Sequence, residues 1–385
     1  MNKNHLINKD RLVNTFTQLG LIDGIHGNEF DIAQYLLGQL DTIGLEAHMD
    51  DAGKTFGGNA GNIIAKLPGT IDAPSIFLCA HMDTIQSTKE LKHVIENGII
   101  STDGNTILGG DDRAGVAVIL EILQTIKENS VLHAPIEILF CVCEEAGMFG
   151  AKNIKRSDLQ SEFGFVFDCQ AQPGAYIVEA PGAVSFQAKV HGRSAHAAVS
   201  PDKGINAIQI ASNAISQLKL GRWDQIGMLN IGTIQGGTSI NVVPDLVEVT
   251  GETRNPDNDK LNMQVEYIRA AFEKASANLG GSVELKFVEK YGGYRFTEDS
   301  PAVIAARKGI IAAGYEPLPL SYPGGSDANI LNNKGITSLN LGVGFKNAHS
   351  FGEYIPIKDL VAAAEIGLNV VVQCATSMKT EEIMK

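Results

Sequence analysis

The stretch IEILFCVCEEAGMFGA, which runs from Ile136 to Ala151, decides the fold that the sequence predicts. Its first half is a run of apolar residues, typical of a strand that is buried on both faces. The run stops at two adjacent glutamates, Glu144 and Glu145. Neighbouring carboxylates directly after a core strand are unfavourable unless a positive group lies nearby. The stretch therefore predicts a buried strand whose end faces a cation.

The composition indicates a globular protein with more than one domain. The chain has 385 residues, of which 44% are hydrophobic, and this length suits two domains better than one. Its formal net charge of −13 argues against nucleic acid or an anionic membrane surface as a partner. The five cysteines form no CxxC pair, and we interpret them as small buried residues without a catalytic role. The absence of a signal-peptide core and of long apolar runs predicts a cytoplasmic protein.

Strands that alternate with helices predict an α/β domain with a mostly parallel sheet covered by helices. The spacing of apolar residues predicts two helices within 9–45, a third from Asp111, and two more at 302–314 and 357–373. We interpret 322–330 as a loop. The runs that we interpret as strands of this sheet are 61–67, 74–80, 136–143, 163–168 and 336–342.

A different pattern interrupts this domain. Between residues 181 and 290 the order is strand, helix, two strands, helix and strand, which is typical of a split βαβ, ferredoxin-like layer. We therefore expect the catalytic domain to consist of residues 1–180 and 291–385. The segment 181–290 would be an α+β domain inserted between these two parts.

Residues of metal-ligating types follow the ends of the predicted strands. In an open α/β sheet, function is expected beyond the carboxyl ends of the strands. Each position alone has an ordinary explanation, such as a solvated turn or a helix cap. Their accumulation at one edge of a sheet nevertheless predicts a metal site. The residues are His81 with Asp83, Asp111 with Asp112, Glu144 with Glu145, Asp168, and His349.

The mixture of imidazole and carboxylate groups favours Zn²⁺, with Co²⁺ or Mn²⁺ as substitutes. The set exceeds one tetrahedral site and suffices for two ions about 3.5–4 Å apart that share a carboxylate. His81 and Asp83 share a face of an extended strand end, so Asp83 can orient the His81 ring. Of Glu144 and Glu145, one can bind an ion while the other acts as a general base on water.

The chain contains seven motifs whose sequence and order resemble those of the M20 family of di-zinc peptidases, and of its peptidase T-like branch in particular. They are CAHMDT, LGGDDRAGVA, EEAGMFGA, FVFD, HGRSAHA, GGSDAN and NAHSFGE. The resemblance covers nearly the whole chain and implies a cis peptide between Asp111 and Asp112. The M42 aminopeptidases share a similar DDRxG motif and are the family most easily confused with this one.

The resemblance implies a role for each residue of the predicted metal site. Glu144 would be the general base, and Asp83 would orient His81. One zinc ion would be bound by His81 and Asp168, the other by Glu145 and His349, with Asp111 as the bridge.

The resemblance also implies that the inserted segment is a lid and dimerisation domain that contributes to the site. His196 would stabilise the oxyanion, often from the partner subunit of a homodimer; without the resemblance, a surface histidine is the simpler interpretation. Asn241 and Arg254 would bind the carbonyl or carboxylate of the substrate. A backbone loop in contact with the substrate would consist of Gly324, Gly325 and Ser326.

The chain departs from this resemblance at one position. Tripeptidases of the T type carry an arginine directly before the glycine pair, where this chain has Pro323. The missing positive charge predicts relaxed selectivity for substrate length.

The expected function is that of a cytoplasmic di-zinc metallo-exopeptidase. It would act on short peptides as an aminopeptidase of tripeptidase-like type, with metal-bound water as the nucleophile. An N-acyl-amino-acid amidohydrolase or a carboxypeptidase of the same architecture remains an alternative. A catalytically silent metal-binding protein is a further one, against which the intact Glu144 argues.

Overall fold

The computed structural model describes residues 6–382. Residues 1–5 lie outside this described part. The expectation that the chain lacks a signal-peptide core concerns a segment that begins with these residues. The chain divides into two compact units. Unit 1 consists of Met1–Val178, Phe296–Leu320 and Ser326–Lys385, and unit 2 consists of Glu179–Arg295 and Ser321–Gly325. Within the described part, no helix combines the length and the apolar character needed to span a membrane.

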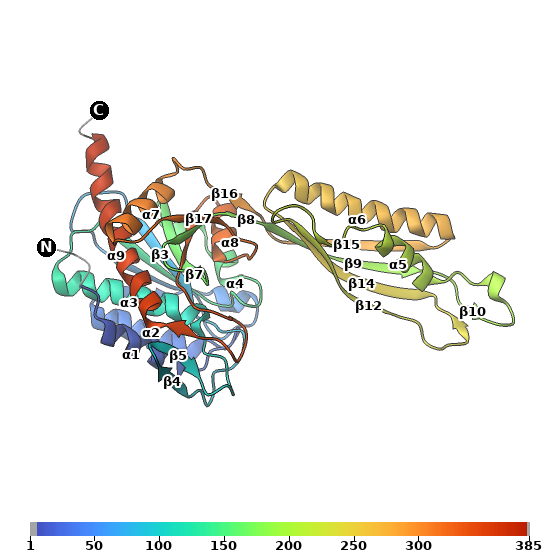
Figure 1. Ribbon diagram of the computed structural model, residues 1–385, viewed down its shortest axis with the longest axis horizontal. Coiled ribbons are helices and arrows are strands. Elements are labelled where there is room, and N and C mark those ends of the chain that lie inside the picture. Colours follow the sequence, from blue (N-terminus) through green and yellow to red (C-terminus); the bar gives the residue numbers. More distant parts are fainter. Residues whose placement is uncertain (1–5, 383–385) are drawn as a thin grey trace. The chain divides into compact units, whose positions relative to one another are not determined.

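Unit 1 is built on a mostly parallel sheet, which confirms the predicted fold class (Figure 1). Its main strands are β1 (Glu46–Met49), β2 (Ile63–Leu67), β3 (Ile76–His81), β6 (Ile136–Cys141), β7 (Phe163–Cys169), β8 (Ala175–Ala180) and β18 (Thr337–Gly342). The adjacent strands β6, β3, β7 and β18 run parallel. Strands β1, β2 and β8 pair antiparallel at the two sides. Strands β3 and β6 are buried along their whole length, which explains their continuous apolar sequence.

Helices cover both faces of this sheet. They are α1 (Lys9–Gly20), α2 (Phe30–Ile43), α3 (Gly110–Asn129), α4 (Phe149–Asn153), α7 (Pro301–Ala312), α8 (Asp327–Asn333) and α9 (Ile357–Glu382). Helix α3 packs on β3 and β7, and α9 packs on α3 and α7; the core on this face includes Leu78 and Phe165. Because side chains alternate along a strand, Cys79 and Cys141 point to the opposite face, where Asp327 of α8 lies close to both.

The predicted loop 322–330 is wrong in its second half, because helix α8 begins at Asp327. Ser326 is the N-cap of this helix, and its backbone N–H donates to Oδ1 of Asn329 at 3.1 Å. The reciprocal hydrogen bonds of this capping box satisfy donors at the helix start. The GGSDAN motif therefore combines a loop with the first turn of a helix.

The strand predicted at 136–143 ends earlier than expected, at Cys141. Cys143 has a φ of +54°, which lies in the left-handed region that a side chain with a Cβ atom adopts at a cost in free energy. Its N–H donates to Oε1 of the buried Glu29 at 2.9 Å. This sharp turn leads the chain from the strand into Glu144 and Glu145.

Apart from the two-residue strands β10, β11 and β13, unit 2 has the predicted order of strands and helices. It contains β9 (Gly182–His191), α5 (Ala207–Ser216), β11 (Gly221–Arg222), β12 (Met228–Gly236), β14 (Leu246–Asn255), α6 (Asn258–Leu279) and β15 (Ser282–Tyr291). The sheet order is β11-β12-β14-β9-β15, with antiparallel neighbours. Helices α5 and α6 pack on the sheet around Phe186, Val249 and Phe272. Two short strands, β10 (Ala195–His196) and β13 (Val242–Val243), form a separate pair.

Candidate functional site

The first group of metal-ligating side chains lies at the carboxyl ends of the unit 1 strands. His81 ends β3, Asp168 lies near the end of β7, and Asp111 lies at the start of α3. Nε2 of His81 lies 3.2 Å from Oδ1 of Asp111 and 3.9 Å from Oδ1 of Asp168. The ligand atoms of these three residues all lie within 4.8 Å of one another. The structure thus brings together the residues predicted to hold one ion.

Asp111 also belongs to a second group, together with Glu145 and His349. Nε2 of His349 lies 3.3 Å from Oδ2 of Asp111 and 3.0 Å from Oε1 of Glu145, and these ligand atoms again lie within 4.8 Å of one another. The two oxygens of Asp111 therefore face two different histidines, as a bridging carboxylate requires. Glu144 belongs to neither group.

The LGGDDRAG sequence forms the corner that presents Asp111. Gly109 has a φ of +72°, a conformation that a residue without Cβ adopts readily. A Cβ atom at Gly115 would lie 2.0 Å from the backbone oxygen of Phe167. Only glycine therefore lets α3 pack this closely on β7. The peptide between Asp111 and Asp112 is cis, as the resemblance implies.

Asp83 connects the first ligand group to the glutamate pair. Nδ1 of His81 lies 3.1 Å from the backbone oxygen of Asp83 and 3.3 Å from its Oδ1. The same carboxylate accepts the backbone N–H of Glu144 at 3.0 Å and that of Glu145 at 3.1 Å. The sequence predicted the contact with His81. It did not predict that Asp83 also fixes the backbone of the two glutamates.

Glu353 is a site residue that the sequence analysis missed. It is only 2% exposed, and its Oε1 accepts the backbone N–H of Asp111 at 3.0 Å. Its Oε2 accepts those of Leu108 at 3.0 Å and Gly109 at 2.8 Å. Burial raises the pKa of Glu353 to about 7. The available signal was a carboxylate within the NAHSFGE motif, shortly after His349.

Asn340 of β18 fixes Asp168 from the neighbouring strand. Its Oδ1 accepts the backbone N–H of Asp168 at 3.2 Å, and its Nδ2 donates to the backbone oxygen of Asp168 at 2.9 Å. Nδ2 also donates to Oγ of Ser326 at 3.1 Å. Ser326 was predicted to contact the substrate. In unit 1 it is buried, and it caps α8.

The electrostatics of this centre favour bound cations. Burial raises the pKa of Glu144 and of Asp168 well above the ordinary value of a carboxyl group. Burial also opposes the ionisation of Asp111, but hydrogen bonds with the His349 and His81 rings outweigh it and hold its pKa far below the usual range. Buried carboxylates that outnumber the imidazoles are stabilised by divalent ions. The donor set of imidazole nitrogen and carboxylate oxygen fits zinc or a similar ion.

His196 and Asn241 lie together at one end of unit 2. His196 belongs to β10, which pairs with β13, and the N–H of Ala197 donates to the backbone oxygen of Asn241 at 2.9 Å. Nδ1 of His196 lies 3.2 Å from the backbone nitrogens of Ala198 and Val199. The His196 side chain is exposed, so it is available to a ligand.

Arg254 lies near the opposite end of the unit 2 sheet. Its NH1 group donates to the backbone oxygen of Pro323 at 3.4 Å, and its NH2 group lies 3.1 Å from Oε1 of Glu252. Strand β14 spans about 26 Å from Leu246 to Arg254, and His196 lies beyond the Leu246 end. Within one chain, Arg254 and His196 therefore cannot contact the same short peptide.

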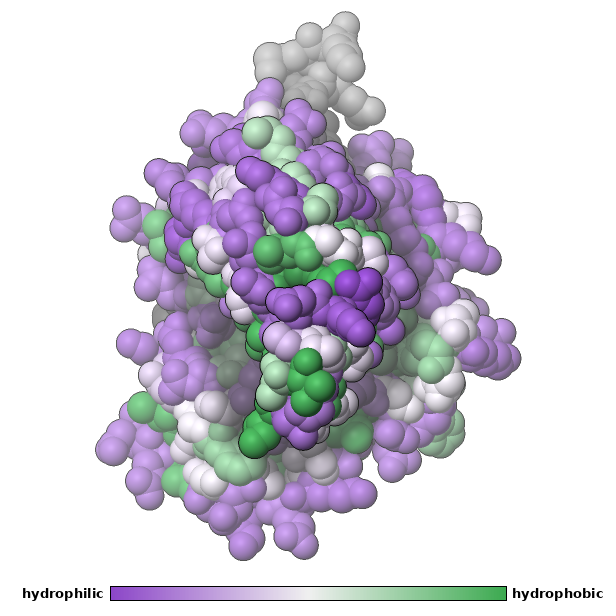
Figure 2. Space-filling model, turned by 90° about the vertical axis from the view of Figure 1, so that its right-hand side faces the viewer, coloured by the Kyte–Doolittle hydropathy of each residue, from purple (hydrophilic) through white to green (hydrophobic). Residues whose placement is uncertain are grey.

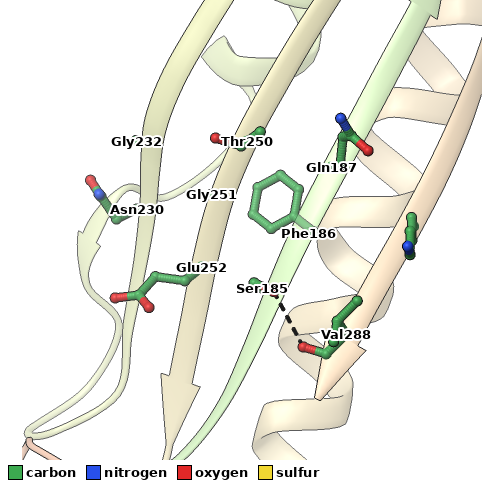
Figure 3. Close-up of a pocket in the computed structure, with 10 residues that line it drawn as sticks. Ser185, Phe186, Gln187, Asn230, Gly232, Thr250, Gly251, Glu252 and Val288 are labelled. Atoms are coloured by element: carbon green, nitrogen blue, oxygen red, sulfur yellow. Dashed lines mark hydrogen bonds between the residues drawn. The ribbon is translucent and has the colours of Figure 1, made fainter. Parts of the chain in front are cut away.

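A hollow of about 510 Å³ opens on the face of the unit 2 sheet (Figure 3). Its lining includes Ser185, Gln187, Asn230 and Glu252, from three neighbouring strands. None of the predicted site residues lines this hollow, and no group of metal-ligating side chains lies in it. We therefore place the candidate site at the ligand groups of unit 1.

Two family models match parts of the chain. The M20-type model described as the peptidase dimerisation domain matches residues 178–279, and the model described as peptidase family M28 matches residues 62–214. The first match covers most of unit 2. The second includes Asp111, Glu145 and Asp168.

Similar proteins and solved structures match along nearly the whole length. An uncharacterised protein of Bacillus subtilis, YqjE, is 37% identical over 96% of this chain and 100% of its own. The crystal structure of aminopeptidase PepT from Bacillus cereus has a TM-score of 0.93 at 35% identity, and covers 96% of this chain and 100% of that chain. The crystal structure of a tripeptidase from Staphylococcus aureus has a TM-score of 0.93 at 37% identity, with 96% and 99% covered.

Proposed function

This chain belongs to the M20 family of metallopeptidases, in its peptidase T-like branch, and we propose that it is a two-metal aminopeptidase of tripeptidase-like type that hydrolyses short peptides. The observation that carries the proposal is the pair of ligand groups that share Asp111, while Glu144 belongs to neither. The structural relatives described as an aminopeptidase and a tripeptidase support exopeptidase activity.

The chain's own side chains would hold two divalent ions, for which zinc is the best candidate and cobalt or manganese are substitutes. His81, Asp111 and Asp168 would hold one ion, and Asp111, Glu145 and His349 the other. When bound, the ions would polarise the scissile carbonyl and lower the pKa of a water molecule.

Glu144 acts as the general base in this proposal. Its carboxylate takes a proton from the attacking water and delivers it to the leaving amine. Two features suit it to this role: it lies outside both ligand groups, and Asp83 holds its backbone N–H. Because Glu144 is half-buried, its carboxylate is partly shielded from bulk water, which strengthens its interaction with charge in the site.

The residues of unit 2 would bind and orient the peptide. His196 would donate a hydrogen bond to the oxyanion, and Asn241 would bind a substrate carbonyl. The Arg254 guanidinium would bind the carboxylate of the substrate, since its planar group can form two parallel hydrogen bonds. The backbone of the loop formed by Gly324, Gly325 and Ser326 would line the same pocket.

We propose that a homodimer completes the active site. His196 and Arg254 lie at opposite ends of the unit 2 sheet, so a peptide that contacts both must receive them from two chains. In a two-fold dimer both partners use the same surface, and each would supply His196 and Asn241 to the other.

Exposed hydrophobic side chains on unit 2 support such an interface. Figure 2 shows hydrophobic surface among the polar side chains of the face that it presents. Apolar groups left in water favour burial against a partner. Ile240 directly precedes Asn241, and Val199 lies three residues after His196. The exposed residues are Val199, Ile208, Leu220, Ile234 and Ile240.

A cytoplasmic location suits the five cysteines, all of which are buried and free, because a reducing compartment keeps thiols in this state. The negative net charge disfavours nucleic acid and anionic membranes as partners. The proposed substrates are therefore short peptides in the cytoplasm.

The alternatives of an N-acyl-amino-acid amidohydrolase or a carboxypeptidase use the same chemistry with a different pocket. A panel of tripeptides, N-acetyl-amino acids and C-terminally blocked peptides separates them, measured with added Zn²⁺, Co²⁺ or Mn²⁺. We expect hydrolysis of tripeptides with a free amino terminus, and weaker hydrolysis of C-terminally blocked ones because Arg254 would lose its carboxylate partner. Hydrolysis confined to N-acetyl-amino acids would identify an amidohydrolase, and release of the C-terminal rather than the N-terminal residue from tripeptides would identify a carboxypeptidase.

Elemental analysis of the holoprotein tests the metal centre directly. We expect at least two divalent ions per chain, of which the ligand groups that share Asp111 hold two. At most one ion per chain under every metal condition would contradict the two-metal proposal.

A further inference from the structure

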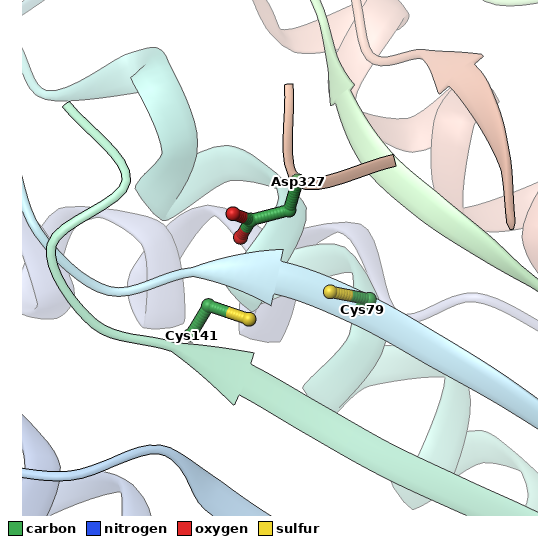
Figure 4. Close-up of side chains that lie close together, drawn as sticks. All are labelled: Cys79, Cys141 and Asp327. Carbon is green, nitrogen blue, oxygen red and sulfur yellow. The ribbon is translucent and has the colours of Figure 1, made fainter. Parts of the chain in front are cut away.

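We propose that Cys79, Cys141 and Asp327 form a binding site for a thiophilic divalent cation such as Zn²⁺ or Cd²⁺, next to the proposed catalytic centre and distinct from it. The three side chains come from β3, β6 and the first turn of α8 and point toward one another (Figure 4). Their ligand atoms all lie within 4.8 Å of one another. None of the three belongs to the ligand groups described above, and the inference does not rest on the proposed function.

The carboxylate of Asp327 lacks a strong partner. The residue is 1% exposed, and neither of its oxygens accepts a hydrogen bond of ordinary geometry. The thiol of the neighbouring Cys141 is placed to donate to the Asp327 carboxylate, and thiols are weak donors. Burying a carboxylate without strong donors is costly, and such a group in a native fold calls for an explanation such as a bound ion.

The two thiols are placed to share an ion rather than to form a disulfide. In the parallel pair of β3 and β6, Cys79 lies opposite Leu139, whereas Cys141 lies opposite His81. A strand spacing of about 4.8 Å and an offset of two residues, about 6.6 Å, put their Cα atoms about 8 Å apart. A disulfide does not bridge Cα atoms more than about 7 Å apart. Two zinc–sulfur bonds of about 2.3 Å do bridge sulfur atoms about 4 Å apart.

The donor set matches the coordination of a soft divalent ion. Two thiolates and both oxygens of Asp327 supply four ligand atoms, so the ion needs no water in a buried site. Sulfur ligands select zinc-like ions over magnesium or calcium. Binding forms two metal–sulfur bonds and releases the two thiol protons to solvent. The net charge of the cluster is unchanged, because one divalent ion replaces two protons.

An ion in this position would join three elements that carry the proposed catalytic centre. Strand β3 ends at His81, β6 leads to the two glutamates, and α8 follows Ser326. We therefore assign the site a structural role that fixes these elements relative to one another. Its occupation should raise the thermal midpoint of unfolding.

Cobalt substitution tests the site without reference to activity. The proposed catalytic ligands contain no sulfur, so a thiolate-to-cobalt charge-transfer band in the near ultraviolet reports only on a cysteine site. The protein is produced in medium supplemented with Co²⁺, so that a buried site fills during folding. We expect the band together with three cobalt ions per chain, two of them in sulfur-free sites.

Variants assign the band to these residues. Cys79→Ala and Cys141→Ala should each lose the band and one equivalent of cobalt, and Asp327→Asn should weaken both. Cys374→Ala is the matched control, because this equally buried thiol lies in α9 and its loss should leave both unchanged. Circular dichroism checks that each variant folds.

Two results would overturn the proposal. One is wild-type protein with its other cobalt sites filled and no thiolate band, a result that requires no variant to fold. The other is a band that persists in the Cys79→Ala/Cys141→Ala double variant. Failure of the two-metal proposal would give a different result. Fewer than two cobalt ions per chain would then occupy sulfur-free sites, while the thiolate band would remain.

Discussion

The carboxylate of Asp83 accepts the backbone N–H of Glu144 at 3.0 Å and, through its other oxygen, that of Glu145 at 3.1 Å. The side chain of Glu145 faces His349, whereas that of Glu144 belongs to neither ligand group. Fixing both backbone groups on one carboxylate holds the two adjacent side chains in different environments. Asp83 also contacts His81. One residue therefore positions both a proposed ligand and the proposed base.

Glu144→Gln should abolish most of the activity without emptying the metal sites. The amide cannot take a proton from water, and loss of a general base typically lowers kcat by about 10²–10⁴-fold. The measurement combines kcat on a tripeptide with the metal content of the same sample. Glu145→Gln is the comparison and should lower the metal content. The opposite pattern, with metal lost from Glu144→Gln and retained in Glu145→Gln, would reverse the two roles.

Glu353→Gln should weaken metal binding although Glu353 is no ligand. Its carboxylate accepts three backbone N–H groups around Asp111, and an amide would turn a donor toward at least one of them. Loss of such a supporting partner typically lowers metal affinity about 10–100-fold. The affinity is measured by competition with a chelator.

Glu137→Gln is the matched control for Glu353→Gln. Glu137 is also buried, and its Oε2 accepts the backbone N–H groups of Gln160 and Ser161, both at 2.8 Å, but it lies at the start of β6, away from the site. This variant should lower stability while leaving the metal affinity unchanged. Equal metal affinities in the two variants would show that Glu353 does not position Asp111.

The elements of the fold were predictable where a local pattern determines them. The apolar run before Glu144 and the helical spacing after Asp111 each fix their element from neighbouring residues. Helix α8 was missed because its apolar residues are few and its start depends on the Ser326 cap. The turn at Cys143 was missed because its left-handed φ is held by Glu29, a residue far away in the sequence.

The site was predictable as a set of residue types at strand ends, but its supporting contacts were not. His81, Asp111 and His349 stand out because their types suit metal ions. Glu353 and Asn340 act on backbone groups of residues far away in the sequence. Nothing in the local sequence distinguishes such acceptors from surface residues until the strands are assembled.

Pro323→Arg should increase the preference for tripeptides. Arg254 already donates to the backbone oxygen of Pro323, so a new arginine would bring a second positive charge beside the first. A hydrogen bond to a charged group contributes about 1.5–3 kcal/mol, which corresponds to about 10–150-fold in the ratio of kcat/KM for tripeptides over dipeptides. Pro323→Ala, which removes the ring and adds no charge, should leave the ratio near that of the wild type. A strong tripeptide preference in the wild-type protein would contradict the expectation of relaxed selectivity.

Mixing two inactive variants tests whether two chains build each active site. Glu144→Gln lacks the base, and His196→Ala lacks the oxyanion donor, whose removal typically costs about 2.7–4 kcal/mol of transition-state stabilisation. Each homodimer should be nearly inactive. In a heterodimer with shared sites, one site carries both defects. The other combines the intact Glu144 of one chain with the intact His196 of its partner.

The purified heterodimer, isolated through a different affinity tag on each chain, should therefore recover about half of the wild-type activity, because one of its two sites is complete. Glu144→Gln paired with Glu145→Gln is the control. Both of these residues lie in unit 1, so every site of that heterodimer keeps a defect and no recovery is expected. If the Glu144→Gln and His196→Ala heterodimer also fails to recover, His196 acts within its own chain or not at all. That result would reject the shared site and leave the proposed metal centre of unit 1 intact.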